Sequence, residues 1–147
     1  MGESQLGKKV LAIRLTFVNP ESLRTKSMII DQIFQVAPPG TLIPKPIATG
    51  AFRVKGRGKR RGEDALVYFI PNHSDSRKPH QKGVTASEFE RAHARLVAVG
   101  ELTKEWFKKH LSKCDAEGSC NFTTVGGLFV LMGDAVFSRP GTYWKAS

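Results

Sequence analysis

The chain has 147 residues, of which 40% are hydrophobic and 24% charged, an ordinary composition for a globular domain. This length can form one domain, or two small ones that share an interface, and no apolar run approaches the roughly 18 residues that a membrane-spanning helix needs. Two cysteines are too few for a disulfide scaffold, and no targeting segment is evident, so we expect a cytoplasmic protein.

The formal net charge of +10 is unevenly distributed along the chain. Residues 1–84 contain 15 Lys/Arg and 6 Asp/Glu, whereas residues 85–147 contain 8 and 7. A basic excess of this size favours polyanionic partners, with nucleic acid first and an anionic membrane surface second. We therefore expect a nucleic-acid partner, no membrane partner and no cofactor, and a homodimer remains open.

Residues 1–83 are expected to form a basic α+β region built on a small antiparallel sheet. Lys8 to Val18 alternates in hydrophobicity with a period of two, which predicts a strand. Ser27–Ala37 fits a short helix better than a strand. Pro38-Pro39-Gly40 then stops that element, because proline cannot continue it.

Two further strands are predicted at Ala51–Lys55 and Ala65–Ile70, joined by Gly56–Asp64 as a hairpin loop. The segment from Pro71 to Gly83 is polar and rich in Ser, His, Asn and Pro. This composition is typical of a linker. We therefore place a boundary between regions 1–83 and 84–147.

The predicted hairpin loop has the densest charge in the chain. Six of the ten residues from Arg53 to Gly62 are basic and three are glycine. A flexible loop can fit its cations to successive phosphates, and arginine adds bidentate contacts. A solvated surface loop is the alternative interpretation, but like charges this close destabilise one another without an anion nearby. We predict phosphate contacts from Arg53, Lys55, Arg57, Lys59, Arg60 and Arg61.

Three helices are predicted in residues 84–147. Thr85-Ala86-Ser87-Glu88 has the pattern of a capping box and begins a helix that ends before Gly100. Thr103 caps the next helix, which runs to Ser112. Asn121 is the predicted N-cap of a third helix, Phe122–Met132, whose apolar residues follow a helical period.

A hairpin closes the chain. Ala135–Ser138 pairs with Thr142–Lys145 across a turn that has Pro140 and Gly141 at its two central positions. The order of three helices followed by a hairpin resembles the winged-helix DNA-binding domain superfamily. The resemblance covers roughly residues 84–147 and is one of element order.

The resemblance implies that the hairpin Val136–Lys145 is a wing, which touches the DNA backbone or minor groove beside a recognition helix. Phe122–Met132 would be that helix. It contains no Lys or Arg, and its expected exposed residues are Thr123, Thr124, Gly127 and Val130. Small side chains could admit close contact with phosphates or thymine methyl groups, or could form a protein interface.

An alternative assignment, the helix-turn-helix frame, makes Thr85–Val99 and Thr103–Ser112 the two helices of a helix-turn-helix, with Gly100 in the turn. The lysine-rich second helix would then enter the DNA groove. Phosphate contacts from Lys104 and Lys108 are expected in either frame. The predicted nucleic-acid-binding residues outside the basic loop are Lys104, Lys108, Thr123, Thr124, Arg139 and Lys145.

Two rival functions fit other features. His73, Asp75 and His80 could serve a metal-dependent nuclease, although no recognised spacing of metal ligands or paired carboxylates accompanies them. Gly126 and Gly127 each cost about 1 kcal/mol against alanine in a helix, which is usually tolerated for a close approach, so this helix could dock a partner. We favour binding over catalysis, with double-stranded DNA ahead of RNA as the partner, and assign no catalytic residue and no metal ligand.

Overall fold

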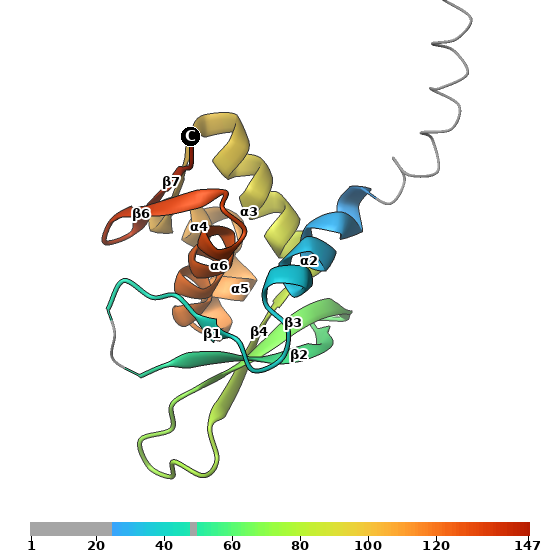
Figure 1. Ribbon diagram of the computed structural model, residues 1–147, viewed down its shortest axis with the longest axis vertical. Helices are drawn as coiled ribbons and strands as arrows, with labels where there is room; N and C mark the ends of the chain where they lie inside the picture. The colour runs from blue at the N-terminus through green and yellow to red at the C-terminus, as the bar shows by residue number, and fades with distance from the viewer. Residues whose placement is uncertain (1–24, 48–49) are drawn as a thin grey trace, which may run out of the picture.

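The computed structural model describes residues 25–47 and 50–147, so the strand predicted at Lys8–Val18 lies outside the described residues. The described chain combines helices with two antiparallel sheets, as the α+β prediction required (Figure 1). The helices are α2 (Thr25–Val36), α3 (Ala86–Val99), α4 (Lys104–His110), α5 (Ser112–Glu117) and α6 (Cys120–Leu131). The strands are β1 (Leu42–Ile43), β2 (Phe52–Arg60), β3 (Glu63–Ile70), β4 (His80–Thr85), β5 (Glu101–Thr103), β6 (Ala135–Arg139) and β7 (Thr142–Lys145).

The larger sheet has the strand order β1-β2-β3-β4. Its central pair, β2 and β3, has a register shift between Val54 and Gly56 and then pairs up to Arg60 opposite Glu63, so that only Arg61 and Gly62 form the turn. Both turn residues have positive φ, 50° and 79°, as a two-residue turn needs to follow the twist of its strands. The predicted loop Gly56–Asp64 is therefore wrong, because Gly56 to Arg60 belong to a strand and each pairs with a residue of β3.

The predicted linker is also wrong in its second half. His80–Thr85 forms β4, which pairs with β3 from His80 opposite Ile70 to Thr85 opposite Ala65. The backbone N–H and C=O groups of this polar segment thus form hydrogen bonds with β3. The polarity of the side chains does not predict this pairing. Because β4 crosses the position of the predicted boundary, no linker separates the two regions.

The predicted caps of the first two helices are confirmed. The Thr85 hydroxyl accepts the Glu88 amide and the Glu88 carboxylate accepts the Thr85 amide, which completes the capping box of α3. Gly100 ends this helix in the left-handed region with φ 91°. The Thr103 hydroxyl accepts the Trp106 amide at 3.1 Å and caps α4.

The connection between α3 and α4 differs from the helix-turn-helix prediction. Glu101–Thr103 forms strand β5, which pairs with β7 and gives the smaller sheet its order β5-β7-β6. The helix-turn-helix frame is therefore wrong, since a paired strand replaces its turn. Helix α5 was not predicted. It follows a break at Leu111, where the helix predicted to run to Ser112 is interrupted.

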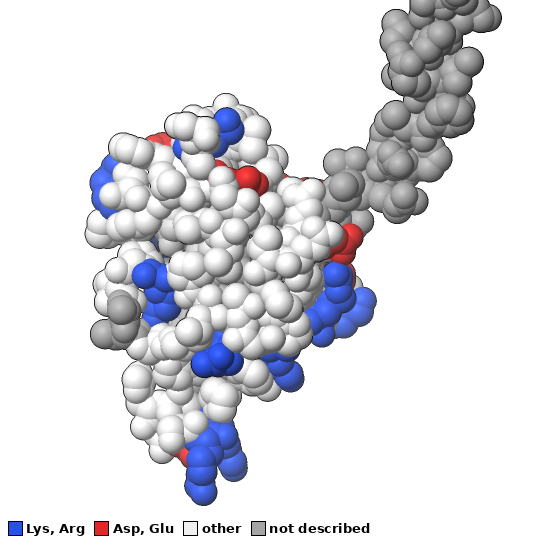
Figure 2. Space-filling view, in the orientation of Figure 1, with Lys and Arg blue, Asp and Glu red and all other residues white. Residues whose placement is uncertain are grey.

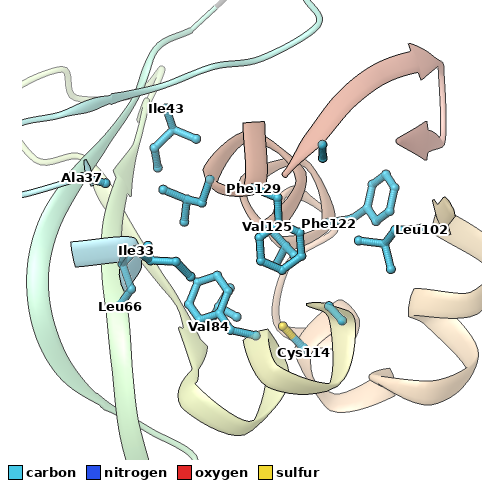
Figure 3. Close-up of a cluster of buried hydrophobic side chains, with 14 of the residues drawn as sticks. Ile33, Ala37, Ile43, Leu66, Val84, Leu102, Cys114, Phe122, Val125 and Phe129 are labelled. Carbon is cyan, nitrogen blue, oxygen red and sulfur yellow. The ribbon is translucent and has the colours of Figure 1, made fainter. Parts of the chain in front are cut away.

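Helix α6 lies between the larger sheet and the hairpin β6–β7 (Figure 3). It begins at Cys120, so the predicted N-cap Asn121 lies inside the helix. The buried Asn121 side chain accepts a hydrogen bond from the Tyr68 hydroxyl and donates one to the Cys114 carbonyl at 2.8 Å. These bonds fix the start of α6 against β3 and α5.

The two glycines of α6 allow close contacts within the chain. A Cβ atom on Gly126 would lie 2.1 Å from Cε1 of Tyr143, and one on Gly127 would lie 2.3 Å from the carbonyl oxygen of Pro44. Both glycines are buried. The helix face proposed to dock a partner is therefore already covered by β7 and by the segment after β1.

A single cluster of buried side chains joins the two regions. Ile33 of α2 and Leu66 of β3 belong to the same cluster as Phe89 of α3 and Phe129 of α6. Figure 3 shows Leu66 and Val84 on the sheet side of this cluster. The core is thus shared across position 83, with α6 at its centre.

Candidate nucleic-acid interface

Four of the six predicted basic residues lie exposed along β2, and three of these four make no bond to a carboxylate in the described structure: Arg53, Lys55 and Lys59. Arg53 donates to the Gly40 carbonyl at 2.9 Å, and Lys55 donates to the Gln81 side-chain oxygen at 3.0 Å. Both of these partners are neutral, and none of the three cations forms an ion pair within residues 25–47 and 50–147. Their charges are therefore available to an external anion.

Arg57 is different, because it already bridges two carboxylates. Its guanidinium bonds Asp31 of α2 at 2.9 Å and also bonds Asp64 of β3, and it lies 4.6 Å from the ring centroid of Phe34. The bond to Asp31 is the main cause of a raised pKa at Arg57. This side chain is about half exposed, so it ties α2 to the sheet while keeping one face in solvent.

Arg60 and Arg61 turn inward toward acidic residues. Arg61 donates to Glu88 at 2.6 and 2.9 Å, to Glu117 at 2.8 Å and to the Gly83 carbonyl at 3.0 Å. Only 20% of its side chain is exposed, and the bond to Glu88 is the main cause of its raised pKa. Arg60 Nε lies 3.7 Å from Glu117. These charges are matched internally, so we leave both residues out of the interface.

The predicted residues of the C-terminal region are also divided. Lys108 on α4, Arg139 at the end of β6 and Lys145 on β7 are exposed. Lys104 is half-buried, because its ammonium bonds Asp115 and the Ser119 carbonyl at 2.8 and 3.0 Å. Thr124 was expected on the surface, but it is fully buried, since the face of α6 that carries it packs into the core.

The exposed cations do not form one continuous patch on the face seen in Figure 2. Basic atoms gather along its right and lower margins and on its left flank, with few acidic atoms among them. The β3–β4 loop adds Arg77 and Lys78, of which Arg77 forms an exposed ion pair with Asp75 at 3.3 Å.

A cleft of about 730 Å³ lies beside the hairpin. Its walls come from the loop after β1, the start of β2, the first turn of α6 and the tip of the β6–β7 hairpin. The loop after β1 and the hairpin tip lie on the same side of the molecule in Figure 1. The cleft is lined by Lys45, Pro46, Ile47, Phe52, Lys104, Ser119, Phe122, Thr123, Phe137, Pro140, Gly141 and Tyr143.

Aromatic rings and two ammonium groups determine the chemistry of this cleft. Phe122 and Phe137 both pack edge-to-face on Tyr143, with centroids 5.6 and 5.7 Å away. Lys45 Nζ lies 4.1 Å from the centroid of Phe52, and Lys104 Nζ lies 5.5 Å from that of Phe122. Burial raises the pKa of Tyr143 to about 12, so its hydroxyl is neutral at physiological pH. The cleft therefore combines apolar planar walls with positive charge.

The apolar character of β7 predicts that Tyr143 and Trp144 pack the hairpin on Phe107 and Phe129, with stacking on bases as the alternative. Tyr143 is buried, but against Phe122 and Phe137, whereas Trp144 is 49% exposed.

The residues proposed for a metal-dependent nuclease are not brought together. Within the described part of the chain, no three His, Cys, Asp or Glu side chains are grouped so that they could hold a metal ion. Asp75 instead accepts the Arg77 amide and its side chain, and His80 pairs with Ile70 in the sheet. No geometric observation therefore supports that rival function.

The cleft could not be predicted from the sequence, because its walls come from five separate segments, including Lys104 of α4. Phe52, Phe122 and Phe137 each looked like core or strand residues in their own segments.

Comparisons with protein-family models, with curated proteins and with solved structures find no match for this chain. Across the described helices, none is both long and apolar enough to cross a membrane.

Proposed function

We propose that the protein binds nucleic acid, with DNA ahead of RNA, through phosphate contacts from β2 and from the hairpin β6–β7. The observation that carries this proposal is that both elements border the same cleft. Phe52 at the start of β2 and Pro140 at the hairpin tip both line it. Arg53 and Arg139, their immediate neighbours in sequence, are exposed. Side chains alternate along a strand, so Arg53 lies on the face of β2 opposite Phe52. A phosphate backbone would therefore contact Arg139 beside the cleft and Arg53 on the outer face of β2.

The topology of residues 84–147 supports this proposal. A helix, a short strand, further helices and a two-stranded hairpin follow one another, and β5 pairs with the returning strand of the hairpin. This arrangement is similar to a winged helix, with β6–β7 as the wing. It departs from one at α6, because Gly127 packs on Pro44 and most of the helix is buried. We therefore place β2 and the wing, rather than α6, on the duplex.

Electrostatics makes this proposal measurable. Each phosphate that a protein neutralises releases counterions, so the binding constant for duplex DNA falls as the salt concentration rises. A plot of the logarithm of the binding constant against the logarithm of the salt concentration has a slope of about −0.9 for each phosphate contact. Changing Arg53, Lys55 and Lys59 together to Gln should lower affinity for a blunt duplex and reduce the slope by roughly 2 to 3. Fluorescence anisotropy titrations at several salt concentrations give both quantities.

A matched control separates local contact from overall charge. Arg91, Lys109 and Lys113 are exposed on α3, α4 and α5, and they form no ion pair in the described structure. Changing these three to Gln removes the same charge elsewhere and should alter the slope much less. Equal effects of the two triple variants would remove β2 from the interface. A wild-type protein that does not bind duplex DNA would overturn the proposed function.

A further inference from the structure

We infer that the cleft beside the hairpin holds one unpaired nucleotide of a bound DNA strand, with its base against the aromatic wall and its phosphate at the start of α6. This inference rests on the proposed function and adds a preference for duplex ends or gaps that expose an unpaired base.

The size and shape of the cleft suit a nucleotide. Sites for small organic ligands commonly enclose about 300 to 1,000 Å³ and combine apolar walls with a few placed polar groups. At about 730 Å³ the cleft lies within this range. A base inside a duplex is stacked on both faces and paired along one edge, so only an unpaired base can enter.

The exposed apolar groups of the cleft offer a surface for stacking. Phe137 of β6 is 41% exposed and Ile47 of the loop after β1 is 68% exposed, although both line the cleft. Behind Phe137, the ring of Tyr143 is buried and in contact with Phe122. Phe137 is therefore supported by packing, while part of its surface remains open. Aromatic side chains of this kind stack on any base, because every base presents a π face.

The polar groups of the cleft suit a phosphate. Ser119 and Thr123 bring the first turn of α6 to the wall, and the Ser119 side chain makes no capping bond. Amide groups of a helix start and its dipole favour an anion. The Lys104 ammonium lies at the same end, where it bonds the Ser119 carbonyl and pairs with Asp115. Its charge is thus matched within the chain, and the helix start supplies the positive end of the cleft. A planar ring that carries an anionic group satisfies both the apolar wall and this positive end.

The test compares a blunt duplex with the same duplex carrying a short single-stranded oligothymidine overhang. The overhang should raise the affinity of the wild type about tenfold, the value of one stacked base. Phe137→Ala and Ile47→Ala should each remove most of this gain while leaving affinity for the blunt duplex unchanged. Both replaced side chains are exposed and lie on different elements, and thermal unfolding checks that each variant is folded.

Val136→Ala is the matched control. Val136 neighbours Phe137 on β6 and is 46% exposed, but it does not line the cleft. This variant should keep the full gain from the overhang. If the overhang gives no gain, or if V136A and F137A behave alike, the inference is overturned while duplex binding by β2 still stands.

A last arm distinguishes a nucleotide in a strand from a free one. Thymidine monophosphate is titrated into the protein and followed by NMR at the Thr123 and Phe137 amides, with the overhang duplex as competitor. We expect weak binding that F137A abolishes and that the overhang displaces. Binding of the free nucleotide that the overhang does not displace would overturn the assignment to a strand. The proposed function fails separately, if the blunt duplex is not bound at all.

Discussion

Arg61 binds both oxygens of the Glu88 carboxylate, with Nε 2.9 Å from Oε2 and Nη2 2.6 Å from Oε1. The same Oε1 accepts the Thr85 amide at 2.9 Å. One carboxylate therefore completes the capping box of α3 and anchors the turn between β2 and β3. Arg61 is the last basic residue of the most basic segment, and its contact with Glu88 gives it a structural role. Arg53 in the same segment bonds only the neutral Gly40 carbonyl in the described structure, so its charge is available to an anion.

Replacing Arg61 should destabilise the protein. In Arg61→Gln the carboxylate of Glu88, whose side chain is only 11% exposed, would lose its cation and retain the bond to Thr85. Removing one partner of a buried pair costs 3–5 kcal/mol, and the remaining exposure reduces this to about 2 kcal/mol. Urea denaturation measures the loss. Lys59→Gln, two residues earlier and exposed, should change the free energy of unfolding by less than about 0.5 kcal/mol.

The same pair should make stability depend on pH in the acid range. Burial of Glu88 opposes its ionisation, but the bonds from Arg61 and the Thr85 amide outweigh burial and lower its pKa in the folded state. A lowered folded pKa gives stability that is fully present above the unfolded value of about 4.3 and is lost as the pH falls through the folded pKa. The difference in unfolding free energy between wild type and Glu88→Gln should therefore shrink below about pH 4. A difference that stays constant from neutral pH into acid would contradict this assignment.

Gly126 should tolerate no side chain. In Gly126→Ala the new Cβ would lie 2.1 Å from the Tyr143 ring, so β7 or the helix must shift. Alanine gains about 1 kcal/mol of helix propensity, yet overpacking of this severity costs more, and we expect a net loss of about 2 kcal/mol. Thermal and urea unfolding give the value. Thr123→Ala, earlier in the same helix and half-buried, should cost little, and equal losses would mean that the Tyr143 contact is not responsible.

The elements that could be predicted from sequence are those specified by neighbouring residues. The capping box at Thr85, the glycine at 100 and the turn at Pro140-Gly141 depend on local hydrogen bonds and backbone angles, and each was found where expected. Strand β5 could not be found in this way, because its three residues become a strand only by pairing with β7.

The candidate site was less predictable because its properties arise from distant contacts. No feature of the sequence separated three arginines, Arg57, Arg60 and Arg61, from Lys59. The arginines differ because they pair with acidic residues that come from three separate helices: Asp31, Glu88 and Glu117. Helix α6 shows the same limit. The spacing of its apolar residues predicted the helix correctly, but it did not predict which of its residues remain exposed. Thr124 became buried because two layers, rather than one, pack on that helix.

The capping box and the ion pair share Glu88, so their losses should not be additive. Thr85→Ala removes the hydroxyl that accepts the Glu88 amide and should cost about 1 kcal/mol. Without Arg61 the Glu88 carboxylate is held less firmly, and the first turn of α3 is already loosened. Removing the Thr85 hydroxyl then costs less stability than it does in the wild type. The double variant T85A/R61Q should therefore lose at least about 0.5 kcal/mol less than the two single variants together, whereas T85A combined with K59Q should be additive. Urea denaturation of the complete set measures this coupling. Simple additivity in the first pair would mean that Glu88 holds the helix start and the β2–β3 turn independently.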